Sequence, residues 1–268
     1  MSDRSADTPV ASPPRPASSR LATALARSRG AGNALDEPAA GGATPAQDAV
    51  LLDRAGNLHD AAYEQLRQAL MDGHFVPGQT FTIRALASVF GTSPMPVRDA
   101  LKRLVAERAL DLQRNRSVVL PLMSRARFQE ILQIRLNLES MITLRAAGRI
   151  TPPVIEAMAN DHRSMCDAVE SGDASQYLAA NRRFHFRLYQ CAGTVVMFPV
   201  IESMWMQIGP LLNQVFRSAE HAVPRADHHH NSVLRALRRQ DGAAAAKAIW
   251  DDLSDAADSI LASDWFKE

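Results

Sequence analysis

Four polar side chains in the second half of the chain are of the types that bind metal ions. Asn181 and His185 are four residues apart, so in a helix they share one face, while His230 and Asp252 follow further along the chain. Imidazole and oxygen ligands brought together from three helices suit Zn, Ni, Mn or Fe(II). The same side chains could instead hydrogen-bond a small effector without a metal, and the sequence leaves both possibilities open.

A basic residue stands near these candidates in an apolar stretch. Arg135 lies in Ile131–Glu139 among isoleucine and leucine side chains, where a guanidinium needs a partner. Glu139, one helical turn further on, is the nearest candidate for a salt bridge. We also expect Gln207 and Asn213, on a later helix, to line one pocket together with Arg135 and the candidate ligands.

A second group of residues has the chemistry of DNA contact. Ser93, Met95 and Arg98 lie at the start of an expected helix, where a recognition helix presents side chains to the major groove. Residues 92–116 contain six basic and three acidic residues, whereas the whole chain is nearly balanced, with 30 Lys and Arg against 29 Asp and Glu. The predicted DNA-contact set also contains Arg103, Arg114, Asn115 and Arg116.

The residues around this second group predict a helix-turn-helix followed by a wing. Gly91 is placed to end the second helix in a left-handed turn, and Ser93 is a good N-cap for the third. The wing tip Arg114-Asn115-Arg116 suits contact with the minor groove or the phosphates. The expected elements are helices over about 60–71, 83–90 and 93–109 and strands over 110–113 and 117–120.

The chain from residue 124 onward is expected to be entirely helical. Ser124 is a good N-cap for the first of these helices. Met204, Trp205 and Met206 are expected in the core, and His228 and His229 in a solvent-exposed loop. The six expected helices span about 124–147, 152–170, 173–192, 197–219, 226–239 and 241–262.

The beginning of the chain has a different composition. Residues 1–50 hold six of the 15 prolines and no aromatic residue, and their five arginines are matched by five acidic residues. Such a segment buries too little apolar area to offset the entropy of ordering, so residues 1–57 are expected to form a disordered extension. Two cysteines exclude a disulfide framework and favour a reducing cytoplasm. No apolar stretch approaches the ~18 residues of a membrane-spanning helix.

The string GQTFTIRALASVFGTSPMPVRDALKRL, residues 78–104, resembles the winged helix-turn-helix of GntR-family bacterial transcription regulators. This resemblance implies a DNA-binding repressor or activator in which Arg84 and Arg98 contact DNA and the Ser93 hydroxyl contacts phosphate. Pro94 departs from the arginine that is common in the family, so one base or phosphate contact is expected to be missing. Asn115 replaces the usual glycine of the wing tip and also tolerates a positive φ.

The helical part resembles the FCD effector domain of the FadR-type subfamily. Many FCD domains bind a metal through an Asp and a His four residues apart and two later His. The resemblance therefore implies a metal site in which two of the four ligand types differ. It also places Arg135 toward the pocket, where it could hold an effector carboxylate in bidentate fashion, and this stands beside the salt bridge to Glu139. The positions that match the ligands are Asn181, His185, His230 and Asp252.

The sequence thus predicts a mostly α, homodimeric transcription regulator whose operator binding responds to a small organic acid, through a hinge near Met123-Ser124. Its expected parts are the extension 1–57, a winged helix-turn-helix over 58–123 and an all-helical effector-binding and dimerisation domain over 124–268. Two other classes remain open. One is a metal-dependent enzyme with a two-His-one-carboxylate site, and the other is a helical interaction scaffold that binds no DNA.

Overall fold

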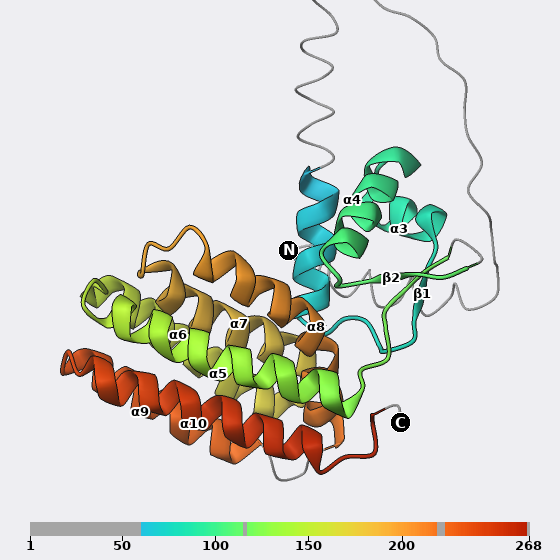
Figure 1. The fold of residues 1–268 in the computed structure, drawn as a ribbon. Helices are drawn as coiled ribbons and strands as arrows, with labels where there is room; N and C mark the ends of the chain where they lie inside the picture. Colours follow the sequence, from blue (N-terminus) through green and yellow to red (C-terminus); the bar gives the residue numbers. More distant parts are fainter. Residues whose placement is uncertain (1–59, 115–116, 219–222, 267–268) are drawn as a thin grey trace, which may run out of the picture.

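The computed structural model describes residues 60–114, 117–218 and 223–266. The expected disorder of residues 1–57 lies outside this part of the chain, as do Asn115 and Arg116 at the wing tip. Figure 1 shows a small unit of helices and short strands at one end of a bundle of long helices. The mostly α fold expected from the sequence is therefore confirmed, with the small unit first along the chain and the bundle second.

The small unit is a three-helix arrangement with a short sheet. It contains a helix over residues 60–71, α3 (Ile83–Phe90) and α4 (Pro94–Ala106), together with β1 (Thr80–Phe81), β2 (Asp111–Leu112) and β3 (Val118–Val119). The sheet is antiparallel in the order β1-β3-β2. The predicted hairpin is confirmed but shorter than expected. The strand β1 was not predicted, because two residues are too few to give an alternating pattern and Thr80 is extended only through its pairing with Val119.

The turn between α3 and α4 has the expected geometry. Gly91 ends α3 in the left-handed region with φ of 62°, a conformation that favours glycine. Ser93 occupies the N-cap of α4, but its side chain makes no capping hydrogen bond. Pro96 removes one of the two backbone N–H groups that commonly donate to such a side chain, because proline has no N–H.

The bundle consists of six long helices within the described residues. Ser124 caps the first of them as predicted, because its side chain accepts a hydrogen bond from the backbone N–H of Arg127. All six predicted helices are confirmed to within a few residues at each end. His228 and His229 lie on the fifth of them, within the helix predicted over 226–239, so the expectation that they stand in a loop is wrong, whereas His228 is exposed as expected. The helices are α5 (Arg125–Ala147), α6 (Pro152–Ser171), α7 (Ala174–Gln190), α8 (Met197–Ser218), α9 (Val223–Arg238) and α10 (Gly242–Leu261).

The two units share one continuous core, which joins the end of helix 60–71 to α8. Gly209 of α8 lies so close to this helix end that a Cβ placed on it would be 2.4 Å from the carbonyl oxygen of Leu70. Asn213 Nδ2 donates to the carbonyl oxygen of Gly73 at 2.6 Å. An ion pair of 2.7 Å joins Arg182 of α7 to Asp72.

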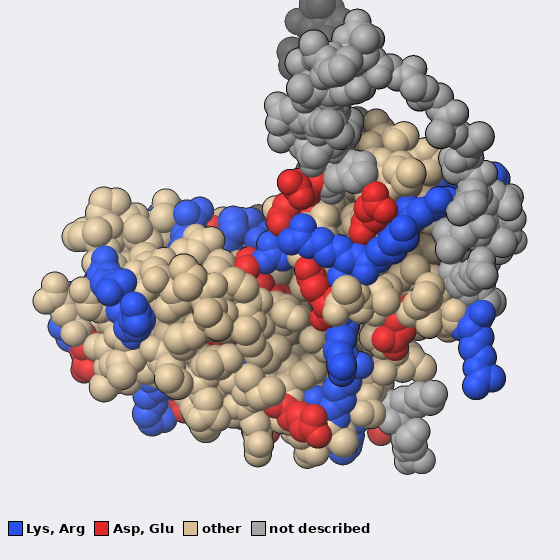
Figure 2. All heavy atoms as spheres, turned by 45° about the horizontal axis from the view of Figure 1, so that its top comes forward, with Lys and Arg blue, Asp and Glu red and all other residues tan. Residues whose placement is uncertain are grey.

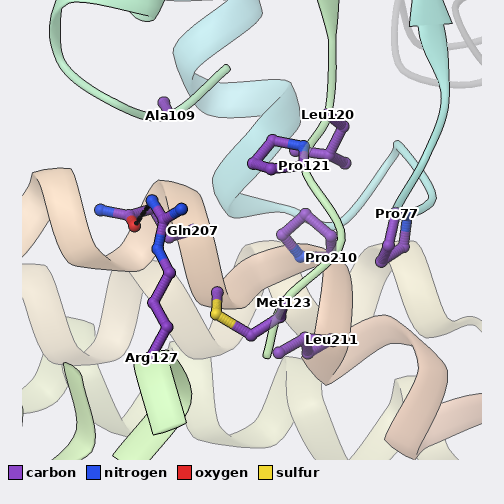
Figure 3. A pocket seen from close by; sticks show the side chains of 9 residues that line it. All are labelled: Pro77, Ala109, Leu120, Pro121, Met123, Arg127, Gln207, Pro210 and Leu211. Atoms are coloured by element: carbon purple, nitrogen blue, oxygen red, sulfur yellow. Dashed lines mark hydrogen bonds between the residues drawn. The ribbon is translucent and has the colours of Figure 1, made fainter. Parts of the chain in front are cut away.

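The connection between the units is packed as well. Met123 is buried against α8, and the side chain of Arg127 donates to Gln207 Oε1 at 2.7 Å and to the carbonyl oxygen of Arg108 at 3.1 Å. Figure 3 shows these side chains around a small pocket that also contains Pro210 and has room for about one water molecule. Gln207 and Asn213 therefore have their hydrogen-bond partners at the junction of the two units, and their place in an effector pocket stays a prediction.

Candidate metal centre and DNA interface

Three of the four predicted ligands meet inside the bundle. His185 of α7, His230 of α9 and Asp252 of α10 are all buried, and their ligand atoms lie within 4.8 Å of one another. His185 Nε2 is 3.3 Å from His230 Nε2 and 3.3 Å from Asp252 Oδ2, and His230 Nε2 is 3.6 Å from Asp252 Oδ1. Asn181, also buried, lies one helical turn before His185 on the same face of α7.

The spacing of these atoms fits a first-row divalent cation. Ligands that each lie about 2.0–2.2 Å from a tetrahedral zinc ion are roughly 3.3–3.5 Å apart. The separations among His185, His230 and Asp252 match this value, and a two-His-one-carboxylate set supplies ligand types that Zn, Mn, Fe and Ni accept. The residues present therefore fit a metal, which His185, His230 and Asp252 would hold.

The two histidines set the charge state of the carboxylate. Burial alone would raise the pKa of Asp252, but the neighbouring His230 and His185 outweigh burial and lower this pKa below its usual value. Asp252 is thus ionised at neutral pH and supplies one negative charge to the cluster.

A second buried network adjoins the cluster and centres on Glu139 of α5. Its carboxylate, which is 0% exposed, accepts from Arg135 Nε at 2.6 Å, Tyr189 Oη at 2.6 Å and Trp205 Nε1 at 3.2 Å. Arg135 also lies over the ring of Trp205, 5.0 Å from its centre. Of the two partners that the sequence left open for Arg135, the structure has the salt bridge to Glu139.

Several members of this region were not predicted as site residues. Tyr189 contacts His185, and burial together with the carboxylate of Glu139 raises the pKa of Tyr189 well above its ordinary value. Trp205 is buried as expected of a core residue, and its indole N–H also donates a hydrogen bond to Glu139. His162 of α6 is buried, with its ring 5.9 Å from that of His230. A histidine in the apolar pattern of α6 was the only sequence signal for it.

Two of the predicted DNA-contact residues of the recognition helix, Met95 and Arg98, share a face. Met95 and Arg98 are three residues apart along α4, and Met95 is 50% exposed. Lys102, which was not among the predicted contacts, continues this face one turn later. Ser93 at the helix start and Arg84 on α3 are exposed on the same unit. In Figure 2 basic side chains form a band across the face of the molecule where the small unit meets the bundle.

The remaining predicted contacts differ in their surroundings. Arg114 is exposed on the wing, while Asn115 and Arg116 are outside the described residues. The guanidinium of Arg103 lies 3.7 Å from the ring centre of Tyr63, and its Nε donates to Glu107 at 3.2 Å. Arg103 thus links α4 to the helix 60–71, which places its side chain away from the face that carries Arg98.

A winged helix-turn-helix joined to a helical bundle with a buried polar cluster defines a DNA-binding transcriptional regulator with a sensory domain. Comparison with known families agrees. The profile for bacterial regulatory proteins of the gntR family matches residues 58–120, and that of the FCD domain matches residues 130–255. The chain belongs to the GntR family of transcriptional regulators and carries an FCD domain.

Individual relatives support this assignment. The chain is 29% identical to the HTH-type transcriptional regulator McbR of Escherichia coli over 66% of this chain and 80% of McbR. It is 24% identical to the gluconate operon transcriptional repressor of Bacillus subtilis over 78% of this chain and 87% of the repressor. The solved structure of E. coli McbR/YncC has the same fold, with a TM-score of 0.72 at 24% identity over 76% of this chain and 97% of that one. The relatives do not favour the enzyme or the scaffold alternative.

Proposed function

We propose that the chain is an operator-binding regulator whose winged helix-turn-helix, residues 58–123, is controlled by a ligand held in the helical domain, residues 124–268. The buried cluster of His185, His230 and Asp252 is the observation that carries this proposal, because a regulator that only bound DNA would have no need of three ligand-type side chains within 4.8 Å in its bundle. Operator DNA is the macromolecular partner, and a bacterial operator places the protein in the cytoplasm.

The proposed DNA contacts are Arg84, Ser93, Met95, Arg98 and the wing residues Arg114, Asn115 and Arg116. Arg98→Ala is expected to weaken operator binding by about 1–3 kcal/mol with loss of discrimination at one base pair, because a bidentate arginine contact to a base edge has this value. Binding is measured at fixed salt by fluorescence anisotropy, with an operator selected from random DNA by the full chain.

Arg239→Ala is the matched control, since it removes the same charge from an exposed site at the end of α9 in the bundle. A phosphate contact would instead weaken binding evenly across sequences and lower the salt slope by about one. Equal operator affinity of the Arg98→Ala and Arg239→Ala proteins would contradict the proposed recognition face.

The proposed effector is a small organic acid that a divalent metal anchors at His185, His230 and Asp252, with Asn181 as a fourth ligand. The cluster has one negative charge and a divalent cation brings two positive ones, so the loaded site retains a positive charge that favours a carboxylate. Arg135 contributes to this recognition only if the effector displaces Glu139, to which the guanidinium is bound at 2.6 Å. Gluconate is a suitable first probe, because one relative is named as a gluconate operon repressor.

We further propose a homodimer formed through α5. This helix exposes Ile134, Met141 and Leu144, which are 48–59% exposed and lie on the side of α5 opposite its buried face. A dimer also provides the two recognition helices that a two-fold symmetric operator requires.

Met141→Lys is expected to shift the protein from dimer to monomer, because a charge in the centre of an apolar interface loses its solvation. The oligomeric state is measured by sedimentation across a concentration series. Gln176→Lys on α7 adds the same charge at an exposed polar position and is expected to leave the dimer intact. A Met141→Lys protein that sediments like the wild type would place the interface elsewhere.

A further inference from the structure

The second ring nitrogen of His185 has a partner that metal binding alone does not explain. Its Nδ1 lies 3.1 Å from the hydroxyl oxygen of Tyr189, one turn further along α7, while its Nε2 faces Asp252 and His230. A neutral imidazole carries one N–H, and only the other nitrogen has a lone pair for a metal. The neighbours of the ring therefore decide which nitrogen can be a ligand.

The single proton of the Tyr189 hydroxyl is used in a hydrogen bond to Glu139. Tyr189 Oη donates to Glu139 Oε2 at 2.6 Å, and the carboxylate of Glu139 also accepts from Arg135 and Trp205. An ionised carboxylate has no proton to return, so the hydroxyl oxygen of Tyr189 is left to accept from His185. Arg135, which is also buried, forms an ion pair with Glu139 at 2.6 Å, so the carboxylate has a cationic partner inside the bundle.

We propose that Glu139 and Tyr189 form a buried hydrogen-bond relay that keeps the ring proton of His185 on Nδ1. The relay thereby leaves Nε2 unprotonated, as the ligand atom that faces Asp252 and His230. This inference rests on the effector site proposed above and assigns the two residues a positioning role in it. Supports of this kind fix the ring orientation and tautomer of metal-binding histidines.

Asp252 competes with Tyr189 for the ring proton of His185. Asp252 Oδ2 lies 3.3 Å from Nε2 of His185, so without an acceptor at Nδ1 the proton of His185 would lie on Nε2, which would donate a hydrogen bond to the carboxylate of Asp252. The tautomer with a proton on Nε2 blocks coordination until the proton is displaced. Tyr189 and Asp252 thus act on opposite nitrogens of one ring, and the hydroxyl of Tyr189 is the contact that favours an unprotonated Nε2.

The test compares Tyr189→Phe with Tyr63→Phe, which removes the same hydroxyl from a hydrogen bond to Glu107 in the DNA-binding unit. In full-length protein labelled with ¹⁵N-histidine, the imidazole shifts at mildly alkaline pH are expected to show a protonated Nδ1 of His185 in the wild type and in Tyr63→Phe. In Tyr189→Phe the proton is expected on Nε2. The affinity for Zn²⁺, measured by chelator competition, is expected to fall about 10- to 100-fold in Tyr189→Phe alone.

Glu139→Gln is the second variant, because it keeps the shape of the side chain while its amide can donate to Tyr189. The hydroxyl proton is then free to turn toward His185, and the same move of the histidine proton to Nε2 is expected. Arg135 loses its buried counterion in this variant, which can prevent folding. If Glu139→Gln does not fold, the Tyr189→Phe protein alone tests the relay.

An unprotonated Nδ1 of His185 in the wild type would overturn the proposal, as would wild-type imidazole shifts and Zn²⁺ affinity in the Tyr189→Phe protein. Failure of the proposed function gives a different pattern. Operator binding is measured on the same samples. A wild-type protein that bound no Zn²⁺ would contradict the proposed metal in the effector site. The imidazole shifts would still test whether Tyr189 keeps the proton of His185 on Nδ1.

Discussion

Gly209→Ala is expected to lower the melting temperature by roughly 5–10 °C, which corresponds to about 2–3 kcal/mol for a protein of this size. The added Cβ would lie 2.4 Å from the carbonyl oxygen of Leu70 and 2.6 Å from that of Met71. These are backbone atoms at the end of helix 60–71, and they move only if the whole helix end moves. Alanine in place of glycine within a helix gains about 1 kcal/mol, but overpacking of this severity exceeds that gain.

Gly148→Ala is the matched control for this substitution. Gly148 has a φ of -79° at the end of α5, and a Cβ there meets no atom within 4 Å, so the melting temperature is expected to stay the same or rise slightly. Both variants are measured by calorimetry. Because the displaced helix belongs to the DNA-binding unit, Gly209→Ala is also expected to weaken operator binding. Equal melting temperatures of the two variants would show that the junction tolerates the extra methyl group.

The sequence predicted the local features of this fold because they depend on neighbours along the chain. The helix end at Gly91, the cap at Ser124 and the six helices of the bundle each follow from residues within a turn or two. The pair Asn181 and His185 could be placed on one face of a helix for the same reason. The strand β1 was missed because its extended shape comes from pairing across nearly forty residues.

The features that the sequence did not predict depend on how helices meet. Gly209 lies inside the predicted helix over 197–219, and only the packed structure shows that it allows the close approach of the end of helix 60–71. Glu139 was considered only as a partner for Arg135, but Tyr189 and Trp205 converge on it from α7 and α8. The side chain of Asn213 donates a hydrogen bond to the carbonyl oxygen of Gly73, which is 140 residues away in the chain. No local pattern encodes such contacts.

These long-range contacts also suggest how the two units communicate. Trp205 of α8 donates to Glu139 beside the cluster, and Gly209 and Asn213 on the same helix touch the end of helix 60–71. A hinge near Met123-Ser124 remains a proposal, and the packing of Met123 against α8 ties any movement there to this helix. A ligand that shifts α8 therefore acts on both connections between the units.

Simultaneous replacement of His185 and His230 by alanine is expected to abolish the effector response while operator binding by the ligand-free protein persists. Loss of two of three clustered ligands is expected to lower the affinity for Zn²⁺ by more than about 100-fold, since changes outside the coordination sphere alone typically cost 10- to 100-fold. Coupling of about 1–3 kcal/mol corresponds to a 5- to 150-fold change in operator affinity, and this change is the quantity that should vanish.

The measurement is operator affinity with and without Zn²⁺ and gluconate, before and after treatment with a chelator, alongside elemental analysis of the purified protein. His228→Ala is the control, because His228 is exposed on α9 near His230 and outside the cluster. If the metal anchors the effector, the chelator should remove the wild-type response as completely as the double substitution does. If the side chains bind the effector directly, the double variant should lose the response and the chelator should have no effect. A full response in the double variant would refute a shared site at these residues, with or without a metal.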